Sequence, residues 1–526
     1  MRGLPTAFRR FLSVALLAAL VASPSPALGH AERPTQFPAP PGSVPKYRTS
    51  GPYLVVCKGT QTASRIEQLP AGLRAENESL FEECRADGFR HIQSAIEHVE
   101  EQGTRILVLP GKYTEKPSGR PPSGECAALE GHDEPLSYQQ QRKCPHVDNL
   151  IAIMGDGPDE GIACDRAVCK LQIEGTGDGP EDVVIDNHFR KLNAIRADRA
   201  DGVFFRNFTV QRSEFNSVYV IETDGFVIDR MVARWNDEYG FLTFSSDHGL
   251  YKRCEAYGNG DSGLYPGSAA DLGHSRPSIE IRRCTSHHNT LGYSGTAGNS
   301  TFVHHNRFFK NGTGAVMDSF FPDHPGLPQD SATFRHNLIS GNNSDYYKYW
   351  ADGTCQDIEE ARKRFDEGVV CPSIPSPIGV GVLVAGGNAN WFQNNWIWNN
   401  WRYGTMQFWV PATLREEEDP SKLYDTSHFN EYTANRMGYA PDGTVLPNGT
   451  DFWWDVEGEG NCWQGNVSAP GEEITSEPPI LPDCDSGGSP PGPFSTVFQF
   501  TTCASWSKEN HHPPGCDWME KPPPPE

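Results

Sequence analysis

A repeat with a fixed period is the feature that most constrains this chain. The segments Asp201–Phe208, Asp224–Met231 and Asp247–Cys254 align at intervals of 23 residues, twice in succession. With insertions, the pattern continues through four further anchor residues: Cys284, Asn306, Asn337 and Asn395. A period between about 20 and 50 residues is typical of stacked units that each bury their neighbour. We therefore expect a solenoid built from stacked coils.

Apolar residues recur at two positions of each unit, on either side of the anchor. The first set stands three residues before the anchors and comprises Phe205, Ile228, Tyr251, Ile281, Val303, Phe334 and Phe392. The second stands two residues after them and comprises Val210, Ala233, Ala256, Ser286, Phe308, Ile339 and Ile397. Alternation with polar neighbours is typical of strands, so each set is expected to form an inward column.

An asparagine follows five residues after each of the last six anchors. These residues are Asn236, Asn259, Asn289, Asn311, Asn342 and Asn400. Asparagine tolerates left-handed backbone angles, and its amide can bond to the backbone of the next coil. The pattern predicts a bend at this position of every coil.

The segment before the repeats predicts a helix over residues 89–102, in which Ile92, Ile96 and Val99 share one face. A buried strand, residues 106–109, and a Pro110-Gly111 turn follow. Helix, strand and this turn together resemble the opening of right-handed parallel β-helix proteins of the pectate-lyase-like superfamily, and the likeness extends over roughly residues 85–410. A leucine-rich repeat would need regular leucines and a helical half, and a β-sandwich gives no reason for a fixed period. We expect an all-β, right-handed parallel β-helix with an N-terminal capping helix and a disulfide-containing C-terminal tail.

Composition shifts divide the chain into five parts. They are a signal peptide (1–29), a Pro-rich linker (30–50), an N-terminal cap (51–120), the β-helix (121–412) and a Cys-, Trp- and Pro-rich segment (413–526). Three insertions interrupt the β-helix near residues 266–277, 318–329 and 345–377. The short apolar run in 11–22 is too brief for a membrane anchor, so we expect a secreted protein without a membrane span after the signal is removed.

The fourteen cysteines and the net charge of −23 restrict compartment and partners. An even cysteine count fits an oxidising compartment, and the acidity disfavours nucleic acid as a partner. Pairing nearest neighbours gives the bridges 57–84, 126–144, 164–169, 254–284, 355–371, 462–484 and 503–516. Cys254 and Cys284 occupy the same anchor position, and geometry alone leaves them as either a disulfide or a stacked thiol pair.

Four basic residues, two positions before successive anchors, form a predicted outward stripe: Lys252, Arg282, His304 and Arg335. They can hold uronate carboxylates, with His304 or Lys252 as general base, or they can be solvated surface residues. The insertion at Asp318, Asp323 and His324 offers a second acid–base set and is similar to the D-P-H-D stretch of alginate epimerases, although the order here is Pro-Asp-His-Pro. A rigid loop is the alternative interpretation.

Further candidates lie on other positions of the coils. Glu238 and Asp261 both stand seven residues after their anchors, so two carboxylates about 5 Å apart are expected, suited to a glycosidase or to calcium. They can equally be acids that decorate a turn. Trp396 and Trp398 share outward parity and can contact sugar rings or be covered by a loop. No zinc site is indicated by the cysteine spacing.

The resemblance implies a carbohydrate-active protein. We expect an acidic polysaccharide as partner, acted on by a lyase or epimerase, because cations outnumber paired acids on the stripe. The alternatives are a non-catalytic extracellular polysaccharide-binding or adhesin-like module, and a glycoside hydrolase. Calcium is retained as a candidate ligand, and a monomer is expected.

Overall fold

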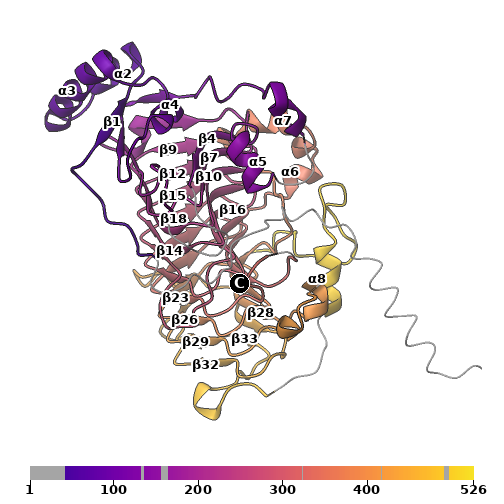
Figure 1. Cartoon of the computed structure of the whole chain (residues 1–526). Coiled ribbons are helices and arrows are strands. Elements are labelled where there is room, and N and C mark those ends of the chain that lie inside the picture. Colours follow the sequence, from indigo (N-terminus) through magenta and orange to yellow (C-terminus); the bar gives the residue numbers. More distant parts are fainter. Residues whose placement is uncertain are drawn as a thin grey trace, which may run out of the picture.

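A computed structural model describes residues 42–131, 136–155, 164–322, 324–415, 417–490 and 497–525, with the backbone alone for 497–500. The chain winds through three parallel sheets, A, B and C, which run the length of the molecule (Figure 1). Each winding, or rung, adds one strand to each sheet in turn. The predicted signal peptide, residues 1–29, lies outside the described residues.

The strands of the three sheets are as follows. Sheet A contains β1 (Tyr53–Val56), β2 (Arg105–Val108), β5 (Gln172–Gly175), β8 (Val203–Arg206), β11 (Asp224–Asp229), β14 (Asp247–Lys252), β17 (Ile279–Arg282), β20 (Phe302–His304), β23 (Thr333–Arg335), β26 (Trp391–Gln393), β29 (Glu431–Thr433) and β32 (Cys462–Gln464). Sheet B contains β3 (Gly111–Tyr113), β6 (Val183–Asp186), β9 (Thr209–Gln211), β12 (Val232–Arg234), β15 (Glu255–Tyr257), β18 (Thr285–His287), β21 (Arg307–Phe309), β24 (Leu338–Ser340), β27 (Trp396–Trp398) and β30 (Arg436–Met437). Sheet C contains β4 (Asn149–Met154), β7 (Asn193–Asp198), β10 (Asn216–Ile221), β13 (Tyr239–Phe244), β16 (Ser262–Gly267), β19 (Leu291–Thr296), β22 (Thr313–Asp318), β25 (Val380–Ala385), β28 (Tyr403–Phe408), β31 (Thr450–Trp454) and β33 (Ser476–Glu477).

Helices lie at the ends of the solenoid and in its insertions. The α-helices are α2 (Thr60–Ile66), α3 (Ala71–Asp87), α4 (Ile92–Glu97), α5 (Tyr138–Lys143), α6 (Lys348–Ala351), α7 (Ile358–Arg362) and α8 (Val497–Ala504). Short 3₁₀ turns are η1 (Gly124–Leu129), η2 (Pro180–Asp182), η3 (Thr354–Gln356), η4 (Phe365–Glu367), η5 (Ala412–Arg415), η6 (Pro420–Lys422) and η7 (Cys484–Ser486). Among the described helices, none is long and apolar enough to cross a membrane.

The inward columns predicted from the repeat are confirmed. In sheet A, Ile228 pairs with Phe205 on one side and with Tyr251 on the other, and the column continues to Phe392. The second set stacks in the same way in sheet B, from Val210 to Ile397. All members of both columns are buried in the core, which runs through the middle of the solenoid. Identical positions of successive rungs therefore lie over one another.

The predicted asparagine column is confirmed as a hydrogen-bonded ladder between sheets B and C. Each Nδ2 donates to Oδ1 of the asparagine on the following rung at 2.7–3.1 Å, from Asn236 to Asn448. The sequence predicted a bond from each asparagine amide to the backbone of the next rung. The observed bond runs to the backbone of the preceding rung: Oδ1 of Asn311 accepts the N–H of Asn289 at 3.0 Å. The asparagine itself was expected to adopt the left-handed angle, but the residue before it does so, for example Lys310 (φ 55°). That residue makes the bend, and the asparagine amide then points along the solenoid.

The N-terminal region differs in detail from the prediction. The helix over 89–102 is shorter, α4, and α3 was not predicted. Ile92 and Ile96 of α4 are buried in the core and cover the first rung, as a capping helix should. Residues 42–48 lie along the outer face of sheet A, where the Tyr47 hydroxyl donates to Glu174 at 2.7 Å.

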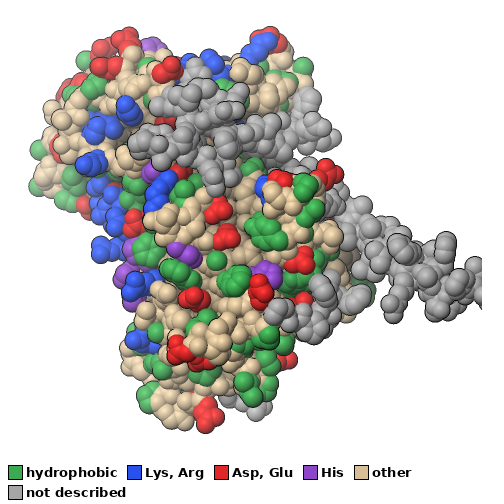
Figure 2. Space-filling model, turned by 60° about the horizontal axis from the view of Figure 1, so that its bottom comes forward, with side chains coloured by type: hydrophobic (Ala, Val, Ile, Leu, Met, Phe, Trp, Pro, Cys, Tyr) green, Lys and Arg blue, Asp and Glu red, His purple; other side chains and the backbone are tan. Residues whose placement is uncertain are grey.

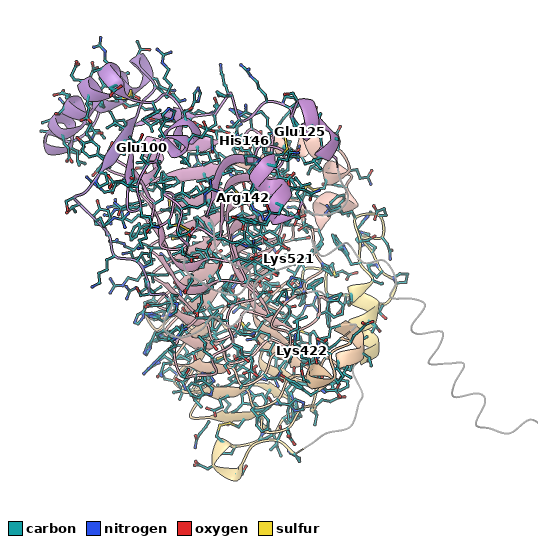
Figure 3. The ribbon with its side chains drawn as sticks, viewed as in Figure 1. Glu100, Glu125, Arg142, His146, Lys422 and Lys521 are labelled. Atoms are coloured by element: carbon teal, nitrogen blue, oxygen red, sulfur yellow. A yellow bond between two sulfur atoms is a disulfide. The ribbon has the colours of Figure 1, made fainter. Side chains whose placement is uncertain are left out.

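The sheets extend beyond the predicted limits of 121–412. They begin with β1 and β2 and continue through β29 to β33, so the segment after 412 adds rungs before its tail departs. The insertion 345–377 carries α6 and α7, which lie beside the upper rungs in Figure 1, where Arg362 pairs with Asp237. Together with the C-terminal tail, the insertion also packs on β19, β22, β25 and β28 of sheet C. Lys521 in that tail lies against the middle of the solenoid, 4.7 Å from the Trp401 ring (Figure 3).

Six of the seven predicted disulfides are confirmed: 57–84, 126–144, 164–169, 355–371, 462–484 and 503–516. The seventh is wrong, because Cys254 and Cys284 are buried free thiols. They are stacked neighbours in the core, and the Cys254 N–H donates to Sγ of Cys284 at 3.3 Å. Stacking in one column brings two cysteines together without requiring a bond between them.

Candidate functional site

The outer face of sheet C carries a continuous apolar surface rather than the polar residues usual on a solvent face. Tyr219, Leu242 and Tyr265 occupy one outward column, and Ile221 and Phe244 the next. All five are buried and pack together. Aromatic surface of this extent is typical of a binding site or a covered interface.

A tail and an insertion close the lower half of this face. Tyr347 and Trp350 of the insertion, with Trp506 and Trp518 of the tail, pack on the outward residues of β22, β25 and β28. Where the cover meets the strands, a small cavity of about 50 Å³ remains, bordered by Asp318. Its lining is mainly apolar and includes Phe320, Phe408 and Trp518.

Three carboxyl groups lie along the edge and face of sheet C. Glu238 and Asp261 stand on adjacent rungs, since the Asp261 N–H donates to the Glu238 carbonyl at 2.9 Å. Asp318 is outward on β22 and accepts a bond from Thr296 Oγ1 at 2.7 Å. Asp261 and Asp318 are buried, Glu238 is half-buried, and Oδ1 of Asp261 has no hydrogen-bond partner among the described residues. The site therefore holds acceptor capacity that its own residues leave unused.

Burial keeps these carboxyl groups protonated at higher pH than usual. It raises the pKa of Glu238 to about 7, with a smaller contribution from the nearby Asp237 carboxylate. It raises the pKa of Asp318 to about 6, although the bond from Thr296 opposes the shift. Burial, and then the charge of Glu238, raises the pKa of Asp261 well above its ordinary value. Perturbed carboxyl groups in such a cluster are typical of functional sites.

A tyrosine–histidine pair lies beside the acids. Tyr265 Oη is 3.0 Å from His324 Nε2, and His324 Nδ1 is 3.0 Å from the carbonyl oxygen of Pro322. Because a carbonyl only accepts, Nδ1 carries the proton, and in a neutral imidazole Nε2 is then the accepting nitrogen, which faces the Tyr265 hydroxyl. Burial raises the pKa of the Tyr265 hydroxyl well above its ordinary value, and the charge of Asp318 raises it further.

Local sequence explains how the pair is held. Tyr265 is outward on β16, and two residues later Gly267 leaves room for its ring, because a Cβ at Gly267 would lie 2.7 Å from that ring. His324 comes from the loop after β22, within the predicted insertion, and its ring packs 5.5 Å from the Phe244 ring. A hydrogen-bonded imidazole and phenol suit proton transfer to and from a bound ligand.

The structure brings together only part of the predicted site. Glu238 and Asp261 directly precede β13 and β16, whereas Asp318 ends β22 and His324 lies in the loop after it, so the two pairs lie at opposite ends of the sheet C strands. Asp323 lies outside the described residues. Tyr265 was not predicted. Its alternate position on β16 shows that its side chain points outward, but this can be recognised only when the register of sheet C is known. The apolar columns of the repeat lie in sheets A and B.

The basic stripe lies on sheet A, away from Asp318 and His324. Lys252, Arg282, His304 and Arg335 share one outward column there. Lys252 lies 3.4 Å from Asp229, and Glu280 lies 3.3 Å from the Arg282 guanidinium and 2.9 Å from His304 Nε2. Three of the four charges are therefore offset within sheet A, and the stripe cannot serve the carboxyl cluster.

The two tryptophans lie on a third surface. Trp396 and Trp398 are half-buried and point outward from β27 in sheet B. The ring of Trp396 packs 5.1 Å from Tyr439, with the Arg436 guanidinium 5.0 Å above it. Residues of the following rung, rather than the 345–377 insertion, cover Trp396.

Calcium at Glu238 and Asp261 stays a prediction. Carboxylate oxygens are the ligands that Ca²⁺ prefers, and the unpartnered Asp261 Oδ1 is a suitable donor atom. The raised pKa values oppose this, since protonated carboxyl groups bind cations poorly.

A second group of possible metal ligands consists of Asp224, Asp247 and His248. The His248 ring bonds to Asp224, and the Arg276 guanidinium donates to Asp247. The hydrogen-bonding groups of this cluster are therefore paired with protein side chains.

Glu238→Gln tests the protonation of the cluster through stability. The folded protein retains the Glu238 proton up to about pH 7, whereas the unfolded chain releases it near the ordinary pKa of 4.5. The unfolded state therefore binds fewer protons in this window, and wild-type stability falls as pH rises from about 4.5 to 7. We expect the variant, measured against wild type by denaturant unfolding, to gain about 1–3 kcal/mol between pH 4 and pH 8. Glu100→Gln, at an exposed position near α4, is the control and should show no such gain (Figure 3); an identical gain would contradict the assignment.

A family model described as right handed beta helix region matches residues 171–322. Together with the three parallel sheets, this match decides the fold. The chain is a right-handed parallel β-helix protein. No curated protein matches the sequence.

Several solved structures share this β-helix fold at low sequence identity. A rhamnogalacturonan lyase is 10% identical, with 87% of this chain and 100% of that chain covered and a TM-score of 0.39. The A-module of the mannuronan C-5 epimerase AlgE4 from Azotobacter vinelandii is 12% identical, with 73% and 91% covered and a TM-score of 0.37. The pectate lyase Pel9A is 11% identical, with 74% of each chain covered and a TM-score of 0.35. These values describe a likeness of fold alone.

Proposed function

We propose that this β-helix protein is a carbohydrate-active enzyme that acts on an acidic polysaccharide by lyase or epimerase chemistry at the outer face of sheet C. The observation that carries the proposal is the Tyr265–His324 pair, whose Oη–Nε2 distance is 3.0 Å. Both reactions begin by removing the proton on the carbon next to a uronate carboxylate. A neutral imidazole that carries its proton on Nδ1 presents Nε2 as a suitable base for that step.

The carboxyl cluster supplies what an anionic substrate needs. Below its pKa of about 6, Asp318, at the same end of sheet C as the His324 loop, can donate a hydrogen bond to the uronate carboxylate and stabilise the charge that moves onto it, as neutral carboxylic acids do in other sites that form enolates. His324 takes the α-proton, and its C–H electron pair moves toward the carboxylate. In an epimerase a proton then returns to the opposite face of that carbon. In a lyase the bond to the neighbouring glycosidic oxygen breaks, and Tyr265 can protonate the departing oxygen.

The aromatic face supports a sugar polymer as the ligand. Tyr219, Tyr239 and Tyr265 present flat rings with polar edges along three successive rungs, and the rings of Tyr239 and Tyr265 are 5.0 Å apart. Rungs repeat about every 4.8 Å, which suits an extended chain that lies along the solenoid. Because the face is buried, we infer that the loop carrying His324 or the tail must move to admit substrate.

One observation favours glycoside hydrolysis as a second candidate. Glu238 and Asp261 lie on adjacent rungs, the arrangement of a retaining pair. That mechanism needs one ionised carboxylate as nucleophile, and both groups have raised pKa values, so we rank it below proton abstraction.

We also propose that the protein is secreted, since its six disulfides suit an oxidising compartment.

The proposal is tested by incubating the purified protein with alginate, pectate and glycosaminoglycans, with and without calcium. A lyase gives the ultraviolet absorbance of an unsaturated uronate, and an epimerase gives a changed ratio of uronate epimers by NMR. New reducing ends without absorbance would support hydrolysis instead. Retention of a glycan without any product would support the non-catalytic binding module and contradict the enzyme proposal.

A further inference from the structure

Cationic residues line the edge where sheet A turns into sheet B. Each rung turns there through one residue with positive φ, and on five successive rungs that residue is Arg or His: Arg230, Arg253, Arg283, His305 and His336. The outward residue just before the turn is cationic on four successive rungs, from Lys252 to Arg335. We call seven of these residues the cation ridge: Arg253, Arg282, Arg283, His304, His305, Arg335 and His336.

The stacked backbone fixes the spacing of this ridge. The N–H of Arg253 donates to the Arg282 carbonyl at 3.1 Å, and the N–H of His305 donates to the Arg335 carbonyl at 3.2 Å. Successive charges are therefore held about one rung, or 4.8 Å, apart along the solenoid. Lys, Arg and His side chains gather in a band along the left flank of the molecule in Figure 2, the side on which the edge between sheets A and B lies in Figure 1.

Some ridge residues face a carboxylate and others do not. Buried Asp229 pairs with Arg253 at 2.7 Å, as well as with Arg206 and Lys252. Glu280 lies 3.3 Å from Arg282 and 2.9 Å from His304. Within the part of the chain that the structure describes, four ridge residues form no ion pair with a carboxylate, and each is exposed: Arg283, His305, Arg335 and His336.

Burial and like-charged neighbours lower the pKa values of the ridge imidazoles. Partial burial lowers the pKa of His305, and the neighbouring His304, His336, Arg283 and Arg335 lower it further. Partial burial and then the charges of Arg335 and Arg436 lower the pKa of His336. These two histidines therefore gain charge only at acidic pH, and Arg283 and Arg335 are the exposed ridge cations at neutral pH that form no ion pair with a described carboxylate.

The backbone fixes where these side chains stand. Each turn between sheets A and B holds one residue at a left-handed angle, as the turns elsewhere on the solenoid do at Trp235 and Lys310. Asn207 (φ 58°) and Asn394 (φ 55°) occupy this turn at either end of the column, and Arg or His occupies it on the five rungs between them. The turn therefore places a cationic or imidazole side chain at the same edge of each of these rungs.

We propose that the cation ridge is a binding site for a polyanionic polysaccharide, a chain whose sugars carry carboxylate or sulfate groups. A line of charges at a fixed spacing matches a polymer with one anionic group per residue. The Arg283 and Arg335 guanidinium groups can each bind a carboxylate or sulfate through two parallel hydrogen bonds. The ridge lies on the edge between sheets A and B, apart from the sheet C site, and the proposal does not depend on catalysis there.

A single-stranded nucleic acid is the other polyanion to consider. Such strands bind where a basic groove is accompanied by exposed aromatic side chains that stack on the bases. Beside the ridge the aromatic rings are already engaged, since Phe302 stacks on His304 at 4.2 Å and Phe309 stacks on His287 at 5.0 Å. The ridge therefore favours a polysaccharide.

The test is titration calorimetry at low ionic strength with dextran sulfate, polymannuronate and uncharged dextran. We expect the wild-type protein to bind both charged polymers, with affinity that falls as salt increases, and not to bind dextran. The double variant Arg283→Gln/Arg335→Gln should bind at least tenfold more weakly, whereas Arg283→Lys/Arg335→Lys should retain most of the affinity. An unchanged melting temperature in both variants shows that folding is preserved.

Two controls separate this site from general charge and from the sheet C site. Lys363→Gln/Arg364→Gln removes two exposed cations from the 345–377 insertion and should change affinity less than twofold. His324→Gln should also bind dextran sulfate normally, so loss of catalysis and loss of ridge binding are distinguishable. The proposal is overturned if neither charged polymer binds at low salt, if polyuridylate binds as tightly as the polysaccharides, or if the Arg→Gln variant binds like wild type.

Discussion

Replacing His324 with Gln, or Tyr265 with Phe, is expected to lower the turnover of the susceptible polysaccharide by about 10²–10⁴-fold, the usual contribution of a positioned acid or base. His324→Gln removes the basic nitrogen, and Tyr265→Phe removes the only hydroxyl proton that reaches Nε2 in the described pair. Substrate affinity should change much less, because neither substitution alters the aromatic face or the carboxyl cluster. Initial rates at several substrate concentrations separate the two effects.

Matched substitutions elsewhere distinguish catalysis from general damage. His98→Gln and Tyr53→Phe remove the same chemical groups from exposed positions at the N-terminal end of the solenoid, beside α4 and on β1, and both should retain wild-type rates. The double variant Tyr265→Phe/His324→Gln should be little slower than the worse single variant, because the two residues act as one unit. Full activity of His324→Gln would remove His324 as the base.

Phe334→Ala is expected to lower the free energy of unfolding by about 3–5 kcal/mol. Phe334 is fully buried in the sheet A column between Val303 and Phe392, and its ring lies 5.0 Å from Tyr293 and 5.7 Å from Phe392. The rigid rungs above and below cannot move together to fill the space, because their own backbone bonds fix the rung spacing. Denaturant unfolding followed by circular dichroism measures the change.

The comparison for Phe334 uses the same substitution at the surface. Phe429 is 53% exposed, so Phe429→Ala should change the free energy of unfolding by less than about 0.5 kcal/mol. Phe334→Leu retains most of the buried area and should lie between the two. A cost for Phe334→Ala no larger than for Phe429→Ala would mean that the ring is not stacked in an interior column.

The repeat was sufficient to predict the stacking of sheets A and B. Their strands lie at fixed distances from the anchor, so Phe205 and Tyr251 could be placed in one column from sequence spacing alone. Sheet C was not placed, although β13 and β16 each begin eight residues after their anchors, Met231 and Cys254, because the two apolar columns read from the repeat lie in sheets A and B. The outward position of Tyr265, and with it the closest partner of His324, was therefore missed.

Charge neutralisation was the second feature that spacing could not predict. Sequence spacing correctly placed Lys252, Arg282, His304 and Arg335 in one outward column. It could not show that Asp229 and Glu280, from neighbouring outward positions, offset three of those charges. Asp318 and His324 were recognised because the chain departs from the repeat at that point, and departures from a regular solenoid are where loops carry function.

The most direct test of the proposed chemistry is deuterium exchange at the carbon next to the uronate carboxylate. Wild-type protein is incubated with an acidic polysaccharide in deuterium oxide, and the isotope content of the recovered sugars or unsaturated products is measured by mass spectrometry. We predict incorporation with the wild-type protein, and incorporation at least about 10²-fold slower with His324→Gln. Chain cleavage or glycan binding with no isotope uptake would contradict proton abstraction at the outer face of sheet C.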